Sequence, residues 1–320
     1  MHMCPYQNNI TTRTYASSKG PIMLQSPAPP AVAQADMRVQ YHYVTVDGVR
    51  IFYREAGSAA NPTIVLLHGF PTSSYMFRNL IPLLAPAYHV IAPDYPGYGN
   101  SDMPDRTTFA YTFDHLAELM TGFLEETGRR RFAMYVQDFG APIGLRIAAA
   151  HPTWITGLIV QNGNAYREGV TFDSPQMRAF WNDRNAFAPI LPLLETKEVA
   201  FQYLHGATNP ENISPDTWNS DLAFFARPGA KEIQLDMLHD YANNFPKYAQ
   251  WQAFFREHQP AALVVWGEND PFFSMAGAQA YKRDLKNIEY HFFPTGHFAL
   301  EEFGPQIAAY INAFKGKLSK

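Results

Sequence analysis

An aspartate occupies the centre of a turn in which a nucleophilic serine is often found. Residues 131–144 read RFAMYVQDFGAPIG, an apolar run that breaks into a sharp turn and continues as a helix-like stretch. Such turns follow G-x-S-x-G and present the central side chain at the top of a parallel sheet. Here the centre is Asp138, with Gly140 two places on. Its carboxylate could attack a substrate carbon, or it could instead cap the N–H groups of the helix start.

Two more ionisable residues follow apolar runs later in the chain. Asp270 follows AALVVWG, and His297 follows IEYHFFP. A histidine suits a general base because its pKa lies near neutrality, and an aspartate can hold the ring in the useful tautomer. Each residue has a structural alternative, a turn or a packed histidine. Three such residues in order at strand ends favour a catalytic triad.

The third feature of the predicted site is a pair of backbone donors. HGFP (68–71) lies at the end of the apolar run 63–69. We expect the N–H groups of Phe70 and Phe139 to form an oxyanion hole, and such a donor contributes about 3–4 kcal/mol at the transition state. An aspartate nucleophile would form an alkyl ester at an sp³ carbon, and water activated by His297 would cleave it. This chemistry needs no metal or organic cofactor.

Alternating strands and helices predict an α/β fold with a mostly parallel, doubly wound sheet. Asp47-Gly48 predicts a β-hairpin turn. The core is expected at 37–163 and 249–320. An aromatic-rich helical stretch at 164–248 interrupts it as an inserted lid. The expected later elements are strands at 63–69, 88–94, 132–136, 155–163, 261–267 and 288–294, with helices at 111–128, 141–150 and 297–318.

Composition restricts the classes of partner. The chain has 320 residues, 47 % of them hydrophobic and 15 % aromatic, with a formal net charge of −4. Without a basic stripe, nucleic-acid binding is not expected. No apolar run reaches the roughly 18 residues of a membrane span, so no membrane partner is expected either. The predicted partner is a small apolar or aromatic substrate. Oligomeric state is not indicated.

Residues 1–36 differ from the rest because they are rich in Pro, Ala and Ser and have one acidic residue, Asp36. They lack the apolar centre of a secretory signal. We expect a disordered leader, with an organellar transit segment as the alternative. Cys4 is the one cysteine of the chain, which excludes an intrachain disulfide and favours a reducing compartment. The cytoplasm is the predicted location.

Several motifs resemble those of the α/β-hydrolase fold, in its branch with an aspartate nucleophile. HGFPTSSYMFRNLIP and VQDFG are similar to the oxyanion and elbow motifs of haloalkane dehalogenases, and GYGNS (97–101) resembles a motif of epoxide hydrolases. The resemblance covers about residues 40–318. It implies the chain order nucleophile, acid, histidine, which Asp138, Asp270 and His297 follow.

Two departures concern the leaving group. Dehalogenases hold the halide with a Trp after the nucleophile and often with an Asn, but these positions are Phe139 and Phe70 here. Phenylalanine side chains have no N–H donor. Trp181 in RAFWNDR could replace one donor, or it could be a packing residue. A Trp directly after the nucleophile is also common in epoxide hydrolases, so Phe139 departs from their pattern as well.

Epoxide hydrolases need an acid for the opening oxygen, usually a lid tyrosine. The stretch DYANNFPKYAQW resembles the segment that carries one such tyrosine, and Tyr241 is the candidate. Tyr203 and Tyr166 are weaker candidates for a second donor. His68 and Tyr166 are also expected near the substrate.

The leading prediction is therefore an epoxide hydrolase that gives diols from apolar molecules. The alternatives are a dehalogenase with a halide site rebuilt from Trp181 and Tyr241, and a non-catalytic small-molecule receptor on the same fold. An ester or lactone hydrolase is less favoured, since carboxylate attack on an ester would give an anhydride.

Overall fold

The structure, a computed structural model, describes residues 38–318. The leader expected at 1–36 lies outside the described residues. Among the helices of 38–318, none combines the length and apolar character needed to cross a bilayer.

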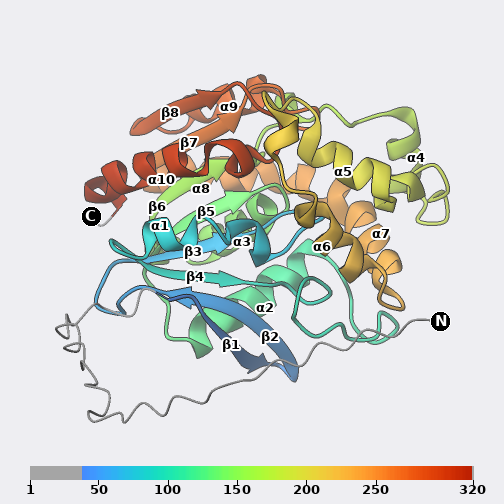
Figure 1. The fold of residues 1–320 in the computed structure, drawn as a ribbon, viewed down its shortest axis with the longest axis horizontal. Helices are drawn as coiled ribbons and strands as arrows, with labels where there is room; N and C mark the ends of the chain where they lie inside the picture. The colour runs from blue at the N-terminus through green and yellow to red at the C-terminus, as the bar shows by residue number, and fades with distance from the viewer. Residues whose placement is uncertain (1–37, 319–320) are drawn as a thin grey trace, which may run out of the picture. The chain divides into compact units, whose positions relative to one another are not determined.

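An eight-stranded sheet forms the centre of the fold, in the order β1-β2-β4-β3-β5-β6-β7-β8 (Figure 1). β1 and β2 form an antiparallel hairpin, β2 pairs antiparallel with β4, and every later pair is parallel. The mostly parallel sheet predicted from the sequence is therefore confirmed. The strands are β1 (Gln40–Val46), β2 (Val49–Ala56), β3 (Thr63–Leu67), β4 (His89–Pro93), β5 (Phe132–Gln137), β6 (Ile155–Gln161), β7 (Ala262–Gly267) and β8 (Ile288–Phe293).

Helices cover both faces of this sheet. Alternate residues of the central strands face opposite clusters, so that Val65 and Met134 belong to one cluster and Ile64 and Tyr135 to the other. Coverage of both faces explains why these strands are apolar throughout. α2 (Phe113–Glu126), α3 (Gly140–Ala150) and α8 (Tyr248–His258) pack on the first face, and α1 (Ile81–Leu84) and α10 (Ala299–Leu318) on the second. The short helix α9 (Met275–Ala280) follows β7.

The stretch between β6 and α8 contains helices and 3-10 turns. Its α-helices are α4 (Pro175–Asn182), α5 (Thr196–Leu204), α6 (Asp216–Phe225) and α7 (Ala230–Asp240). Figure 1 shows them gathered at one end of the sheet. The 3-10 segment Tyr241–Lys247 then leads into α8. We refer to residues 164–248 as the helical insertion.

Candidate active site

Asp138 occupies a strained turn between β5 and α3. Its φ is +47°, a left-handed value that non-glycine residues rarely adopt. Its backbone N–H donates to the carbonyl of Asn162 at 3.2 Å. A Cβ at Gly140 would lie 2.2 Å from the carbonyl oxygen of Leu67, so the tight approach of the turn to β3 requires glycine there. The N-cap position of α3 is Phe139 rather than Asp138.

Two backbone donors hold the carboxylate of Asp138. The N–H of Phe70 donates to Oδ1 at 2.6 Å, and the N–H of Phe139 also bonds to this carboxylate. Burial raises the pKa of Asp138 to about 6, although the charge of His297 and the two N–H bonds oppose this rise. The donors expected at an oxyanion hole therefore point at the carboxylate itself.

His297 lies between two carboxylates. Its Nδ1 is 2.8 Å from Oδ2 of Asp270, and its Nε2 is 3.8 Å from Oδ2 of Asp138. Burial lowers the pKa of His297, but the charge and hydrogen bond of Asp270 and the charge of Asp138 outweigh it, so the pKa is raised. The backbone N–H groups of Phe272 and Phe273 donate to Oδ1 of Asp270, which fixes the second carboxylate.

Asn162 joins the two halves of the site and was not identified from the sequence. Its Nδ2 donates to Oδ2 of Asp270 at 2.7 Å, and its Oδ1 accepts from the N–H of Gly267 at 3.0 Å. Its own carbonyl accepts the N–H of Asp138, and its φ is +42°. The indication in the sequence was the polar run QNGN (161–164), which begins at the last residue of the buried strand β6.

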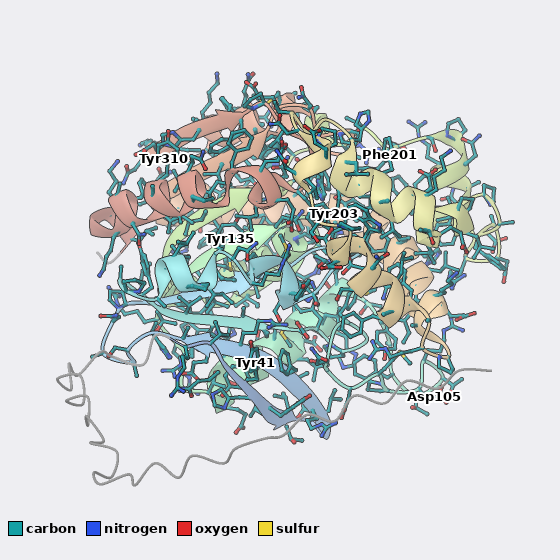
Figure 2. The ribbon with its side chains drawn as sticks, in the orientation of Figure 1. Tyr41, Asp105, Tyr135, Phe201, Tyr203 and Tyr310 are labelled. Atoms are coloured by element: carbon teal, nitrogen blue, oxygen red, sulfur yellow. The ribbon has the colours of Figure 1, made fainter. Side chains whose placement is uncertain are left out.

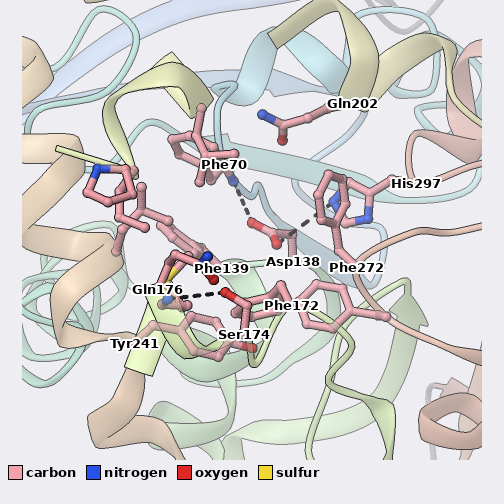
Figure 3. Close-up of a pocket in the computed structure, with 16 residues that line it drawn as sticks. Phe70, Asp138, Phe139, Phe172, Ser174, Gln176, Gln202, Tyr241, Phe272 and His297 are labelled. Carbon is pink, nitrogen blue, oxygen red and sulfur yellow. Dashed lines mark hydrogen bonds and ion pairs between the residues drawn. The ribbon is translucent and has the colours of Figure 1, made fainter. Parts of the chain in front are cut away.

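A cavity of about 510 Å³ opens onto Asp138 and His297 (Figure 3). Its walls are largely aromatic and aliphatic. Among the described residues that line it, none is Lys or Arg. The polar lining residues are Asp138, His297, Ser174, Gln176, Gln202 and Tyr241.

Tyr241 begins the 3-10 segment after α7, and its buried side chain lines this cavity. Phe139 and Phe172 pack against its ring. Its hydroxyl interacts with that of Tyr248, to which Asn164 Nδ2 also donates at 3.2 Å. Burial raises the pKa of Tyr241 well above its ordinary value, so the phenol keeps its proton.

The structure does not bring Tyr203 or Trp181 to the cavity lining, which corrects two expectations. Tyr203 lies on α5 (Figure 2). Its hydroxyl donates to Oδ2 of Asp221 on α6 at 2.5 Å, and its ring stacks on Phe298. Trp181 Nε1 donates to the carbonyl of Leu238 at 3.1 Å. Neither donor is available to a leaving group.

His68 and Tyr166 also lie outside the cavity lining, contrary to expectation. The ring of His68 stacks on Tyr95, with Nδ1 bonded to the carbonyl of Gly69 and Nε2 accepting the N–H of Tyr95. Burial lowers the pKa of His68 to about 4, so the ring stays neutral. The hydroxyl of Tyr166 donates to Oδ2 of Asp284 at 2.9 Å. Both side chains support the loops around the site.

Gln202 on α5 is a polar residue of the cavity that the sequence analysis missed. It is buried, and its side chain hydrogen-bonds to no other residue in the described part of the chain. It lines the same cavity as Phe70 and His297 (Figure 3). The indication in the sequence was a glutamine within the otherwise largely apolar stretch AFQYL (200–204). Within residues 38–318, no group of three or more His, Cys, Asp or Glu side chains is placed to hold a metal ion.

Comparison with known proteins shows the family to which this chain belongs. The family described as alpha/beta hydrolase fold matches residues 62–303. The chain belongs to the α/β-hydrolase family. A relative from Saccharomyces cerevisiae, described as an uncharacterized hydrolase, is 44% identical over 280 residues, which are 85% of this chain and 96% of the relative.

Dehalogenases are among the relatives of this α/β hydrolase. A haloalkane dehalogenase of Mycobacterium marinum is 31% identical over 278 residues, covering 84% of this chain and 92% of the relative. The crystal structure of haloalkane dehalogenase DbeA from Bradyrhizobium elkani has a TM-score of 0.74 and 24% identity, and the match covers 88% of this chain and 99% of that one. At this identity, the similarity to the DbeA structure shows the shared fold alone. The chain is thus an α/β-fold hydrolase with dehalogenase-like relatives.

Proposed function

We propose that this hydrolase opens epoxides of apolar molecules to diols through an ester on Asp138. One observation carries the proposal. The phenol of Tyr241 lines the same cavity as Asp138 and His297, whereas Phe70 and Phe139 stand where a halide site would have side-chain N–H donors. A neutral phenol still carries its proton and can give it to an opening epoxide oxygen, because the alkoxide that forms there is a strong base.

The first step uses the free oxygen of the nucleophile. Oδ1 of Asp138 is held by the Phe70 N–H, which leaves Oδ2 for attack on an epoxide carbon. The new C–O bond forms as the epoxide C–O bond breaks, and the released oxygen takes the proton of Tyr241. Oδ1 then becomes the carbonyl oxygen of the ester, already in contact with its donors.

The second step uses His297 as the base. Water gives a proton to Nε2 and attacks the ester carbon, and the oxyanion forms at Oδ1. Collapse breaks the acyl–oxygen bond and releases the diol. One proton of the water completes the second hydroxyl, and the other restores Tyr241. Because the charge of Asp138 raises the pKa of His297, ester formation lowers that pKa and favours the neutral base when it is needed.

The cavity suits a neutral substrate. Since Lys and Arg are lacking among its described lining residues, no cation there would offset a substrate carboxylate. Rings of Phe70, Phe139, Phe172 and Phe272 offer apolar surface close to the carboxylate. The volume of about 510 Å³ is within the usual range for small-molecule sites.

Haloalkane dehalogenation is the second candidate function. The relative from Mycobacterium marinum carries that name at 31% identity. The amide of Gln202 is a side-chain N–H donor facing the cavity and could hold a departing halide in place of the missing Trp and Asn.

The deciding experiment is the intact mass of the His297→Gln variant after exposure to epoxides and to haloalkanes, with a peptide map. Loss of the base should trap the ester. An adduct on Asp138 with the mass of the whole epoxide is expected. An adduct of the alkyl group without halogen would favour dehalogenation. The His297→Gln protein that also carries Asp138→Asn should form neither, and the absence of any adduct on the single variant would overturn both proposals.

A further inference from the structure

We propose that Gln137 is a positioning residue whose amide follows the proton on His297 and stabilises the imidazolium during ester hydrolysis. The inference rests on the proposed function, because it concerns the second step of that reaction. Gln137 directly precedes the nucleophile and ends β5.

The amide of Gln137 contacts the reacting nitrogen of the base. Gln137 is fully buried, and its Nε2 donates to Nε2 of His297 at 2.8 Å. Since Nδ1 of His297 faces Asp270, the imidazole in this arrangement is neutral, with its proton on Nδ1. The nitrogen that must take a proton from water is therefore already an acceptor.

Protonation reverses the polarity of this contact. Once His297 holds the proton from water, Nε2 becomes a donor, and an amide nitrogen opposite it is unfavourable. The other end of the amide, Oε1 of Gln137, is buried and has no hydrogen-bond partner within residues 38–318. Rotation of the amide by half a turn would bring Oε1 to the N–H without breaking any other hydrogen bond. A bond to the charged ring is roughly twice as strong as one to the neutral ring.

The charges around His297 make this role greatest in the second step. The charged groups that face the ring are Asp270 and Asp138. Both carboxylates can stabilise an imidazolium in the free enzyme. In the alkyl-enzyme Asp138 is an ester, so Asp270 alone keeps its charge. Gln137 then supplies the polar oxygen at Nε2.

The neighbouring strand offers a matched control. Gln161 pairs with Gln137 in the register of β5 and β6 and is equally buried. Both ends of its amide are occupied, because Oε1 accepts from the hydroxyl of Tyr135 and Nε2 donates to the backbone carbonyl of His297 at 3.3 Å. It therefore touches His297 without contacting the ring nitrogens.

The test is single-turnover kinetics on an epoxide, with ester formation and hydrolysis followed separately against pH. In Gln137→Met, ester formation should stay within about twofold, and hydrolysis should slow by about tenfold with its acid limb at lower pH. Gln137→Glu should move the acid limb to higher pH, because a carboxylate favours the charged ring. Gln161→Met should leave the limb in place. Equal slowing of both steps, or an unmoved limb in both Gln137 variants, would overturn the inference.

A second measurement does not depend on turnover. ¹⁵N NMR of the His297 ring should give a lower pKa in Gln137→Met than in the wild type and an unchanged pKa in Gln161→Met. An unchanged pKa in Gln137→Met would contradict the role of the amide. If the NMR shift is found but no alkyl-enzyme forms from any epoxide or haloalkane, the proposed function fails while the coupling of Gln137 to His297 stands.

Discussion

The backbone N–H of Phe70 lies 2.6 Å from Oδ1 of Asp138 and donates to it. Position 70 departs from the dehalogenase pattern in its side chain, but the contact to the carboxylate is made by the main chain, which every residue except proline supplies. The substitution to phenylalanine therefore removes a leaving-group donor and keeps the donor for the ester oxygen. The proposed attack of Asp138 on an epoxide needs the main-chain donor and does not need the side-chain donor.

Tyr241→Phe should slow ester formation from an epoxide by about 100-fold or more, because the opening oxygen loses its acid. The ring is retained, so packing against Phe139 and Phe172 should change little. Stopped-flow or mass-detected single turnovers would measure the rate. An epoxide rate within twofold of the wild type would show that another group protonates the oxygen.

Trp181→Phe provides the comparison, since its indole is committed to the carbonyl of Leu238. We expect kcat/KM to stay within about twofold and the free energy of unfolding to fall by about 1 kcal/mol, the usual contribution of one hydrogen bond. Steady-state kinetics and urea unfolding would measure both. A large loss of kcat/KM with unchanged stability would restore Trp181 as a leaving-group donor.

Ester formation should depend on the ionisation of Asp138. Burial raises its pKa to about 6, and the protonated carboxyl cannot attack. The value of kcat/KM for an epoxide should thus decline as pH falls below about 6, approaching tenfold per pH unit. The pH profile of kcat/KM, with circular dichroism at each pH to monitor folding, tests this. A decline beginning only near pH 4 would indicate an unperturbed aspartate.

Gly140→Ala should destabilise the fold, because the new Cβ would meet the Leu67 carbonyl at 2.2 Å and backbone cannot easily move. A loss of about 2–3 kcal/mol is expected from such overpacking. Gly316→Ala in α10 is the control. Its Cβ meets nothing within 4 Å, and alanine should stabilise the helix by about 0.5–1 kcal/mol. Chemical unfolding of both variants measures these values, and equal effects would contradict the close approach at the elbow.

Asp221→Asn should stabilise the protein more at high pH than at low pH. Burial raises the pKa of Asp221 to about 7, above its value in the unfolded chain. The folded protein therefore binds a proton at Asp221 more tightly than the unfolded chain does. This contribution to the free energy of unfolding is present at low pH and is lost as pH rises through about 7. Asparagine stays neutral and can still accept from Tyr203. Between about pH 6 and 8 the variant should gain about 1 kcal/mol relative to the wild type. Thermal unfolding at both pH values gives the difference, and a constant difference would refute it.

The sequence alone determined the order of strands and helices. The expected strands at 261–267 and 288–294 correspond to Ala262–Gly267 and Ile288–Phe293. β7 is buried on both faces and leaves a continuous apolar run. The edge strand β8 is only partly buried and keeps a mixed run rich in aromatic residues. The sequence also determined that Asp138, Asp270 and His297 would follow strands whose carboxyl ends share one edge. The parallel sheet then brings these three residues together.

Only the tertiary structure decided which side chains of the helical insertion and of the flanking loops face the cavity. Tyr203, Trp181, Tyr166 and His68 have suitable polar groups, yet each group is bonded elsewhere. Gln202 faces the cavity, and Gln137 and Asn162 contact His297 and Asp270. The physical reason is that hydrogen-bond partners in these regions come from segments distant in the chain, and composition or spacing carries no record of which partner a buried polar group will find.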